Sequence, residues 1–226
     1  MVEIKKAKKI IRFILTISII FAIFLSIWEM NWLNIFLSVF TLILIFIPTL
    51  FEKKYKIEIP TSIELMIVLF LYAAIFLGEI SGFYQKFWWW DSLLHFFSGI
   101  VLGLIGFMIM YILYKTEKFK ASPKIMMIIV FCFALSIGTL WEITEFGLDT
   151  FLSVNTQKAR YLCPSDGFCD SRIGVIDTMR DLILDSIGAL IISIFGYFYL
   201  TKKKGFLIGN IIKSFEKENK KLFKKD

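Results

Sequence analysis

The chain has 226 residues, of which 58% are hydrophobic and 17% aromatic, and its formal net charge is +7. Its mean hydropathy is +0.73, and the apolar residues form long uncharged runs that are typical of membrane-spanning helices. The lysines lie in short clusters between these runs, without the contiguous basic patch that a nucleic-acid backbone requires. Composition therefore predicts an all-α polytopic membrane protein and argues against a nucleic-acid partner.

Six apolar segments are long enough to cross a bilayer, and they predict a transmembrane domain over residues 1–204. The expected spans are residues 10–28, 32–51, 61–79, 91–114, 124–148 and 177–200. The first segment has a basic start, as a signal peptide does. Its end carries Phe24, Leu25 and Ile27 instead of the small residues that cleavage needs, so we expect a retained anchor.

Basic residues divide the loops into two sets. Lysine clusters precede the first span and follow the second, fourth and sixth spans, while the remaining loops are poor in basic residues. The positive-inside bias therefore predicts a multi-pass protein of the cell membrane with both termini in the cytoplasm. Trp28, Trp32 and residues 88–90 then fall at the outer interface, where indole rings prefer to lie.

Residues 205–226 form a basic tail with its own periodicity. Leu207, Ile211 and Phe215 recur at helical spacing with lysines on the other side, which predicts an amphipathic helix lying on the anionic inner leaflet. A solvated and partly disordered tail is the alternative.

Three spans carry acidic residues in the half that is expected to face outward. Asp91 and His95 open the fourth span on one helical face. The other acids also follow helical spacing: Glu142, Glu145 and Asp149 on the fifth span, and Asp177, Asp181 and Asp185 on the sixth. With a rise of about 1.5 Å per residue, His95, Glu142 and Asp181 each lie about 27–31 Å from the lysine flank of their own helix. Three helices therefore bring acids to one level, near the outer edge of the bilayer core.

Seven carboxylates at one level need compensation by protons, by Arg180 and His95, or by a metal ion. Oxygen ligands with one imidazole suit a divalent cation such as Mg²⁺, Mn²⁺, Fe²⁺ or Zn²⁺. The predicted metal ligands are His95, Glu142, Glu145, Asp177 and Asp181. Asp185 is the predicted general base on a metal-bound water, and His95 is the only imidazole available for proton transfer.

Secondary candidates for the same site are Asp91, Asp149 and Arg180. Asp91 and Asp177 also suit a simpler role, because an acid at a helix N-terminus complements the helix dipole. In the loop before the sixth span, Cys163 and Cys169 bracket five residues, so a disulfide is expected if the loop is extracytoplasmic. Two free thiols are the alternative.

Spans four to six carry three motifs in a fixed order. They are Asp91-Ser-Leu-Leu-His95-Phe-Phe-Ser-Gly99, then Trp141-Glu142-Ile-Thr-Glu145-Phe146, then Asp177-Thr178-Met-Arg-Asp181 leading to Gly188-Ala189. This ordered set resembles the YjdF-like inner-membrane family, a family of unknown function. The resemblance covers about half of the chain and supports the site residues, but Asp149, Arg180 and Asp185 lie outside its pattern.

These observations favour a membrane protein that binds a divalent metal ion, with a metal-dependent enzyme acting on a lipid or lipid-linked substrate as one form of it. The level of the acids suggests this substrate class, because lipid head groups lie there. A proton- or cation-coupled transporter is the main alternative, although transport sites usually lie near the membrane midplane. A structural polar cluster without catalysis is the third.

Overall fold

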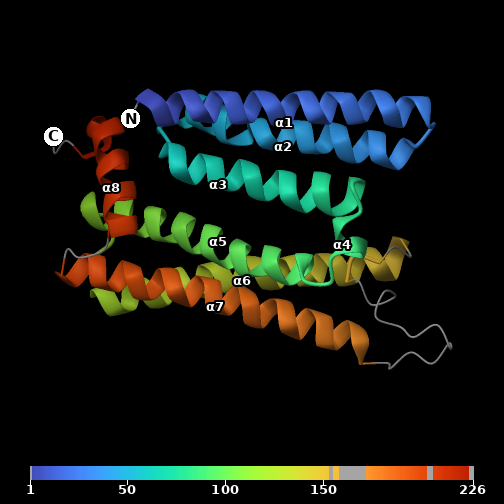
Figure 1. The fold of residues 1–226 in the computed structure, drawn as a ribbon. Coiled ribbons are helices and arrows are strands. Elements are labelled where there is room, and N and C mark those ends of the chain that lie inside the picture. Colours follow the sequence, from blue (N-terminus) through green and yellow to red (C-terminus); the bar gives the residue numbers. More distant parts are fainter. Residues whose placement is uncertain (1, 153–154, 158–171, 203–205, 224–226) are drawn as a thin grey trace. The chain divides into compact units, whose positions relative to one another are not determined.

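The computed structural model describes residues 2–152, 155–157, 172–202 and 206–223, and these ranges contain helices and no strand (Figure 1). The helices form two compact units. The first comprises Met1–Lys86 together with Asn210–Asp226, and the second comprises Phe87–Gly209. The C-terminal segment therefore packs with the first three spans, from which it is far removed in sequence.

The first unit contains three long helices and shorter elements. They are α1 (Val2–Trp28), α2 (Trp32–Tyr55), α3 (Thr61–Leu71) with its π-helical continuation (Tyr72–Ile80), α4 (Phe83–Lys86), the larger part of α8 (Phe206–Glu218) and a 3₁₀ turn (Lys220–Phe223). Leu15 and Ile19 of α1 pack with Ile45 of α2 and Val68 of α3 to form its core. This core is small because the other faces of α1 and α2 are apolar and exposed.

Local signals explain where α2 begins and ends. The Asn31 side chain accepts a hydrogen bond from the Asn34 backbone N–H at 3.1 Å and so caps the N-terminus. Lys56 takes up the left-handed conformation, with a φ of 55°, directly after the last helical residue. The turns at both ends bring α1, α2 and α3 into antiparallel order.

The C-terminal helix α8 forms as predicted, but its apolar side is buried in protein. Ile208, Ile212 and Phe215 are each no more than 2% exposed. The Asn219 side chain accepts a hydrogen bond from the Glu58 backbone N–H at 2.7 Å and donates one to its carbonyl at 2.8 Å. Contact of this helix with the inner leaflet stays a prediction.

The second unit is a bundle of three long helices, α5 (Trp90–Lys115), α6 (Pro123–Leu152) and α7 (Ile173–Lys202) (Figure 1). Glycines let the helices approach closely. A Cβ atom added at Gly99 of α5 would lie 2.2 Å from the Asp185 carbonyl oxygen of α7, and one at Gly188 would lie 2.4 Å from the Phe96 carbonyl oxygen. The backbones of α5 and α7 are therefore in direct contact beside the acidic residues.

The fold prediction is confirmed: the described residues form an all-α protein with six helices long and apolar enough to cross a membrane. These spans are Lys6–Trp28, Trp32–Tyr55, Thr61–Ile80, Trp90–Lys115, Pro123–Leu152 and Ile173–Lys202. Large apolar side chains such as Phe13, Phe24 and Phe146 are more than half exposed, as lipid-facing side chains are. The predicted spans were shorter because charged residues at the ends belong to the same helices. The orientation of the termini stays a prediction.

Candidate functional site

The acidic residues of the second unit converge around its single histidine. His95 lies in the N-terminal half of α5, beside the C-terminal half of α6 and the N-terminal half of α7. The imidazole is 7% exposed, and Glu142, Asp181 and Asp185 are 4%, 1% and 1% exposed. The predicted common level of these groups therefore corresponds to a real cluster inside the three-helix bundle.

Each ring nitrogen of His95 faces carboxylates, but the two sides differ. Three carboxylate oxygens surround Nε2 at nearly equal distances: Asp91 Oδ1 at 3.9 Å, Glu142 Oε1 at 3.8 Å and Asp181 Oδ2 at 3.9 Å. One carboxylate faces Nδ1, with Asp185 Oδ2 at 3.4 Å. The Nε2 side thus collects oxygens from all three helices, whereas the Nδ1 side has a single partner.

Two of the oxygens around Nε2 lack a hydrogen-bond partner. Glu142 Oε1 and Asp181 Oδ2 are buried atoms without a donor within the described part of the chain. Thr178 makes a side-chain hydrogen bond with the Glu142 carboxyl group, but this leaves Oε1 unpaired. Burying a carboxylate oxygen without a hydrogen-bond donor raises the free energy of the folded protein. A cation or a proton beside these two oxygens would remove that cost.

The spacing of these atoms suits a metal ion. Among the described residues, Asp91, His95 and Asp181 each offer a ligand atom, and these atoms lie within 4.8 Å of one another. Ligands about 2.1 Å from one tetrahedral ion lie about 3.4 Å apart, so the 3.9 Å distances from Nε2 to the oxygens of Asp91 and Asp181 need only a small contraction. Glu142 faces Nε2 at 3.8 Å but does not belong to this closely spaced set. Asp91, a secondary candidate in the sequence, is therefore geometrically a stronger ligand than Glu145 or Asp177.

Asp185 is held from two sides. Its Oδ2 faces His95 Nδ1, and the Ser98 hydroxyl donates a hydrogen bond to its Oδ1. A Cβ atom added at Gly138 of α6 would lie 2.4 Å from Asp185 Oδ2, so only glycine leaves room for the carboxylate there. The predicted role of Asp185 as a general base is untested, but these contacts place it on the far side of the imidazole from the Nε2 oxygens.

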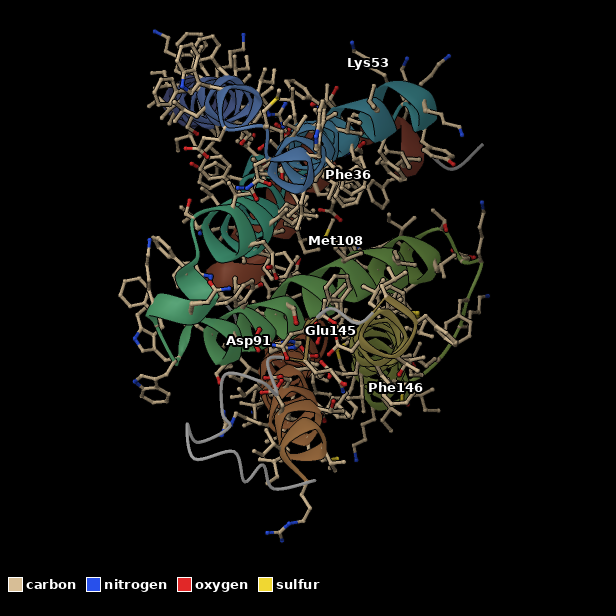
Figure 2. The ribbon with its side chains drawn as sticks, turned by 90° about the vertical axis from the view of Figure 1, so that its right-hand side faces the viewer. Phe36, Lys53, Asp91, Met108, Glu145 and Phe146 are labelled. Carbon is tan, nitrogen blue, oxygen red and sulfur yellow. The ribbon has the colours of Figure 1, made fainter. Side chains whose placement is uncertain are left out.

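The remaining predicted residues lie around this centre in different surroundings. Glu145 is buried and its Oε1 accepts a hydrogen bond from the Trp141 indole N–H at 2.9 Å. Figure 2 shows Asp91 and Glu145 toward the interior of the three helices, and Phe146 on the outer side of α6. Asp177 is 5% exposed and lies in the second turn of α7, so it is not the cap of that helix.

Asp149 and Arg180, the other secondary candidates, have different surroundings. The Asp149 carboxylate accepts hydrogen bonds from the backbone N–H groups of Thr156 and Gln157, at 2.6 and 3.1 Å, and so fixes the turn after α6. Arg180 lies on the exposed side of α7. Cys163 and Cys169 lie outside the described residues, so their expected disulfide stays a prediction.

Ser98 and Thr178 are polar contacts that the sequence interpretation did not assign. Ser98 lies one turn after His95 and Thr178 directly follows Asp177. Both side chains contact acids of the cluster, Ser98 with Asp185 and Thr178 with Glu142. A hydroxyl within an apolar span, one turn from a charged residue, is the signal that could have identified them.

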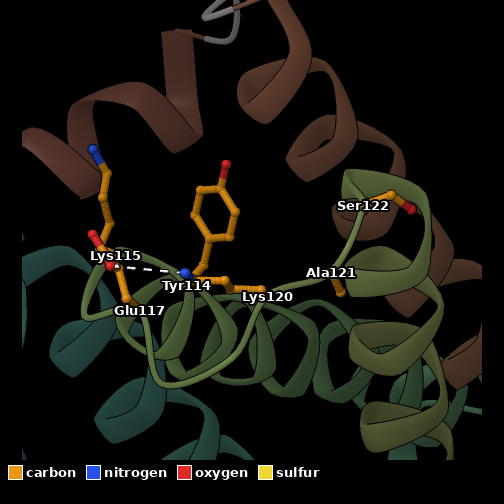
Figure 3. A pocket seen from close by; sticks show the side chains of 6 residues that line it. All are labelled: Tyr114, Lys115, Glu117, Lys120, Ala121 and Ser122. Atoms are coloured by element: carbon orange, nitrogen blue, oxygen red, sulfur yellow. Dashed lines mark ion pairs between the residues drawn. The ribbon is translucent and has the colours of Figure 1, made fainter.

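A pocket of about 720 Å³ lies elsewhere in the second unit, at the connection from α5 to α6 (Figure 3). It is lined by Tyr114, Lys115, Glu117, Lys120, Ala121 and Ser122. Its one drawn ion pair joins Lys120 and Glu117 at 3.9 Å, and both side chains are more than half exposed. The pocket is at the C-terminal end of α5, whereas the acidic cluster lies near the N-terminal end.

Comparison with known families supports the resemblance that the motifs suggested. The family model described as "Predicted membrane protein (DUF2238)" matches residues 10–202, which extend from within the first span to the end of the sixth and include the whole acidic cluster. The chain belongs to this DUF2238 family. Because the match covers α1 to α7, membership extends beyond the half of the chain that carries the motifs.

An uncharacterized protein of Thermotoga maritima is similar to this DUF2238 member. The two are 33% identical over 144 residues, which is 63% of this chain and 66% of the relative. The alignment thus spans slightly less than two thirds of the relative. No solved structure matches the chain.

Proposed function

We propose that the second unit binds a divalent metal ion between His95 Nε2 and the surrounding carboxylates. The observation that carries the proposal is the pair of buried, unpartnered oxygens, Glu142 Oε1 and Asp181 Oδ2, which both face Nε2. Asp91 supplies a third oxygen at a similar distance. An ion among these atoms would satisfy both unpaired oxygens at once.

The charge balance of the cluster supports a cation. Four carboxylates face one imidazole, and a protonated imidazole neutralises only one of them. Because these groups are buried among three helices, water screens their repulsion poorly. A divalent ion would add the positive charge that the described side chains do not supply at Nε2.

The donor set favours a hard or borderline ion. Carboxylate oxygens with one imidazole, and no thiolate among the described ligand atoms, are typical of Mn²⁺, Fe²⁺ or Zn²⁺ sites, and Mg²⁺ is compatible with the oxygens. When bound, such an ion acts as a Lewis acid and can activate a water molecule. The proposal therefore extends to a metal-dependent reaction, with a carboxylate of the cluster as proton acceptor.

A lipid or lipid-linked molecule is the substrate class that the position favours. Trp88 and Trp89 directly precede α5, and their rings are 84% and 40% exposed. Tryptophan side chains prefer the head-group level of a membrane, and Asp91 lies in the first turn of α5 beside them. The ester and phosphate groups of lipids lie at this same level.

The proposal also states which membrane the protein occupies and on which side of it the termini lie. The lysine clusters near the N-terminal end of α1 and around the C-terminal ends of α2, α5 and α7 favour a cell-membrane protein with cytoplasmic termini. In that orientation, the acidic cluster around His95 faces the extracytoplasmic side. Cysteine accessibility labelling at both termini in intact cells would test this part separately.

Metal analysis of purified protein tests the central claim. Protein in detergent is equilibrated in turn with Mn²⁺, Fe²⁺, Zn²⁺ and Mg²⁺, freed of excess ion and assayed by mass spectrometry for bound metal. We expect one ion per chain for the wild type and near-background metal for Glu142→Gln and Asp181→Asn. Glu117→Gln, which changes an exposed acid outside the cluster, is the matched control.

Two results would overturn the proposal. A wild type that retains none of the four ions would leave a structural polar cluster, in which protons compensate the acids. Movement of cations across proteoliposomes that is abolished by Asp181→Asn would identify transport instead of a resident metal centre.

A further inference from the structure

We infer that Asp185 is a positioning residue, which holds the Nδ1–H of His95 and so directs the Nε2 lone pair toward the metal ion proposed between the ring and the three carboxylates on its other side. What the inference implies for metal binding rests on the proposed metal site. The contacts that hold the ring belong to the protein itself, so they can be tested without any ion. Because four carboxylates favour the doubly protonated ring, the test is made at alkaline pH, where the imidazole is neutral.

The two ring nitrogens have partners of different kinds. Asp185 Oδ2 lies 3.4 Å from Nδ1, the closest of the carboxylate contacts to the ring, whereas the oxygens near Nε2 lie at 3.8–3.9 Å. A neutral imidazole carries its proton on one nitrogen and its lone pair on the other. A proton on Nδ1 donates to Asp185, and this leaves Nε2 as the free electron-pair donor.

The surroundings restrict where the Asp185 carboxylate can go. Ser98, one turn along α5 from His95, donates its hydroxyl to Oδ1 and also contacts the His95 carbonyl oxygen at 2.8 Å. Gly138 of α6 leaves just enough room for Oδ2, and Gly99 of α5 brings the Asp185 backbone into contact. Three helices therefore determine the position of one carboxylate.

This arrangement has the chemistry of a metal ligand with its supporting carboxylate. Histidines that bind metals commonly donate their other N–H to a carboxylate, which fixes the tautomer and makes the ligand more basic. The same carboxylate would be a poor general base, because it is occupied on both oxygens and separated from the Nε2 side by the ring. Proton acceptance would then fall to a carboxylate on the Nε2 side.

The chain's only histidine makes the tautomer directly measurable. Protein labelled with ¹⁵N-histidine gives imidazole signals that belong to His95 alone, and their shifts distinguish a proton on Nδ1 from one on Nε2 in metal-free protein whose imidazole is neutral. We expect the Nδ1–H form in the wild type and a shift toward the Nε2–H form in Asp185→Asn. An unchanged tautomer in this variant would overturn the inference.

Two further variants separate positioning from general damage to the fold. Ser98→Ala removes the hydroxyl that holds Asp185 and should give a smaller shift in the same direction. Ser186→Ala is the matched control, since among the described residues the Ser186 hydroxyl bonds to the Leu182 carbonyl oxygen of its own helix, at 2.7 Å, and to no acid of the cluster. A tautomer change in Ser186→Ala equal to that in Ser98→Ala would contradict the role of Asp185.

Titration of the same proteins with Zn²⁺ separates this inference from the proposed function. Loss of a supporting carboxylate typically weakens metal binding about 10–100-fold, and we expect a weakening of this size in Asp185→Asn. If the wild type binds no Zn²⁺ but the tautomer changes in Asp185→Asn, the positioning role stands and the metal proposal fails for zinc. If Zn²⁺ binds equally well to both proteins and the tautomer is unchanged, the positioning role fails and the metal proposal stands.

Discussion

The protein contains two buried charged clusters, one in each unit, and they are built on opposite principles. In the first unit, Glu64 of α3 is fully buried and each of its oxygens has a cation: Lys8 and Arg12 of α1 both pair with it. Arg12 also donates a hydrogen bond to the Thr49 hydroxyl of α2 at 2.6 Å. In the second unit, four carboxylates face one imidazole, and two of their oxygens have no hydrogen-bond partner among the described residues.

The difference distinguishes a cluster whose charges are balanced by neighbouring side chains from one in which acids outnumber the cations that face them. The Glu64 cluster satisfies its acid entirely from its own chain, so it joins three helices without needing a ligand. In the His95 cluster, four carboxylates face one imidazole among the described residues, and charged groups of this kind inside a span support the function that we propose for it. Both clusters contain buried acids, so acidity alone does not distinguish them; the number of cations that face each acid does.

Neutralising the acid in the first unit should have the largest effect on stability. Glu64→Gln leaves Lys8 and Arg12 without their counter-charge, and breaking a buried ion pair costs about 3–5 kcal/mol. Unfolding in mixed micelles with increasing denaturing detergent measures the loss. Glu29→Gln, at an exposed acid after α1, should change little, and an equal loss in both variants would contradict the structural role of Glu64.

A metal ion should stabilise the protein only through the His95 cluster of the second unit. At an ion concentration about 100 times the dissociation constant, binding to the native state adds about 2.7 kcal/mol to stability. We therefore expect Zn²⁺ or Mn²⁺ to raise the melting temperature of the wild type and of Glu64→Gln, but not that of Asp181→Asn. A similar increase in all three proteins would show that the ion acts outside the His95 cluster.

Close helix contact around the second cluster should be sensitive to one methyl group. Gly99→Ala would place its Cβ against the Asp185 carbonyl, and overpacking of this kind costs about 1–3 kcal/mol. Gly147→Ala is the control, because nothing lies within 4 Å of its added Cβ. Melting temperatures of the two variants in detergent provide the comparison, and equal values would argue against the tight approach of α5 and α7.

The smallest change in stability is expected for Glu142→Gln, and this variant contrasts most directly with Glu64→Gln. In the presence of chelator, Glu142→Gln should leave stability unchanged or raise it, because it removes one of several like charges. The same substitution type is therefore harmful in one cluster and harmless in the other. A loss in metal-free Glu142→Gln as large as in Glu64→Gln would mean that both clusters are structural.

The spans and the level of the acids could be predicted because both depend on local information. Apolar run lengths identify the helices, and residue counts along each helix give the depth of Glu142 and Asp181. The partner of each acid could not be predicted, because it depends on helix rotation and packing. Asp185 is one turn from Asp181 yet faces the other ring nitrogen, and Glu145 is one turn from Glu142 yet accepts from Trp141.

The hydrogen bonds between Asn219 and Glu58 have a consequence for how the protein is made. The first unit is discontinuous, because its C-terminal part follows the entire second unit in the chain. During synthesis, α1 to α3 are made well before Asn219. The backbone N–H and carbonyl groups of Glu58 therefore lack their Asn219 hydrogen bonds while residues 87–209 are added. A ribosome-bound chain that stops before α8 would therefore have a first unit without its C-terminal part. Chaperones and proteases can act on such an incomplete unit.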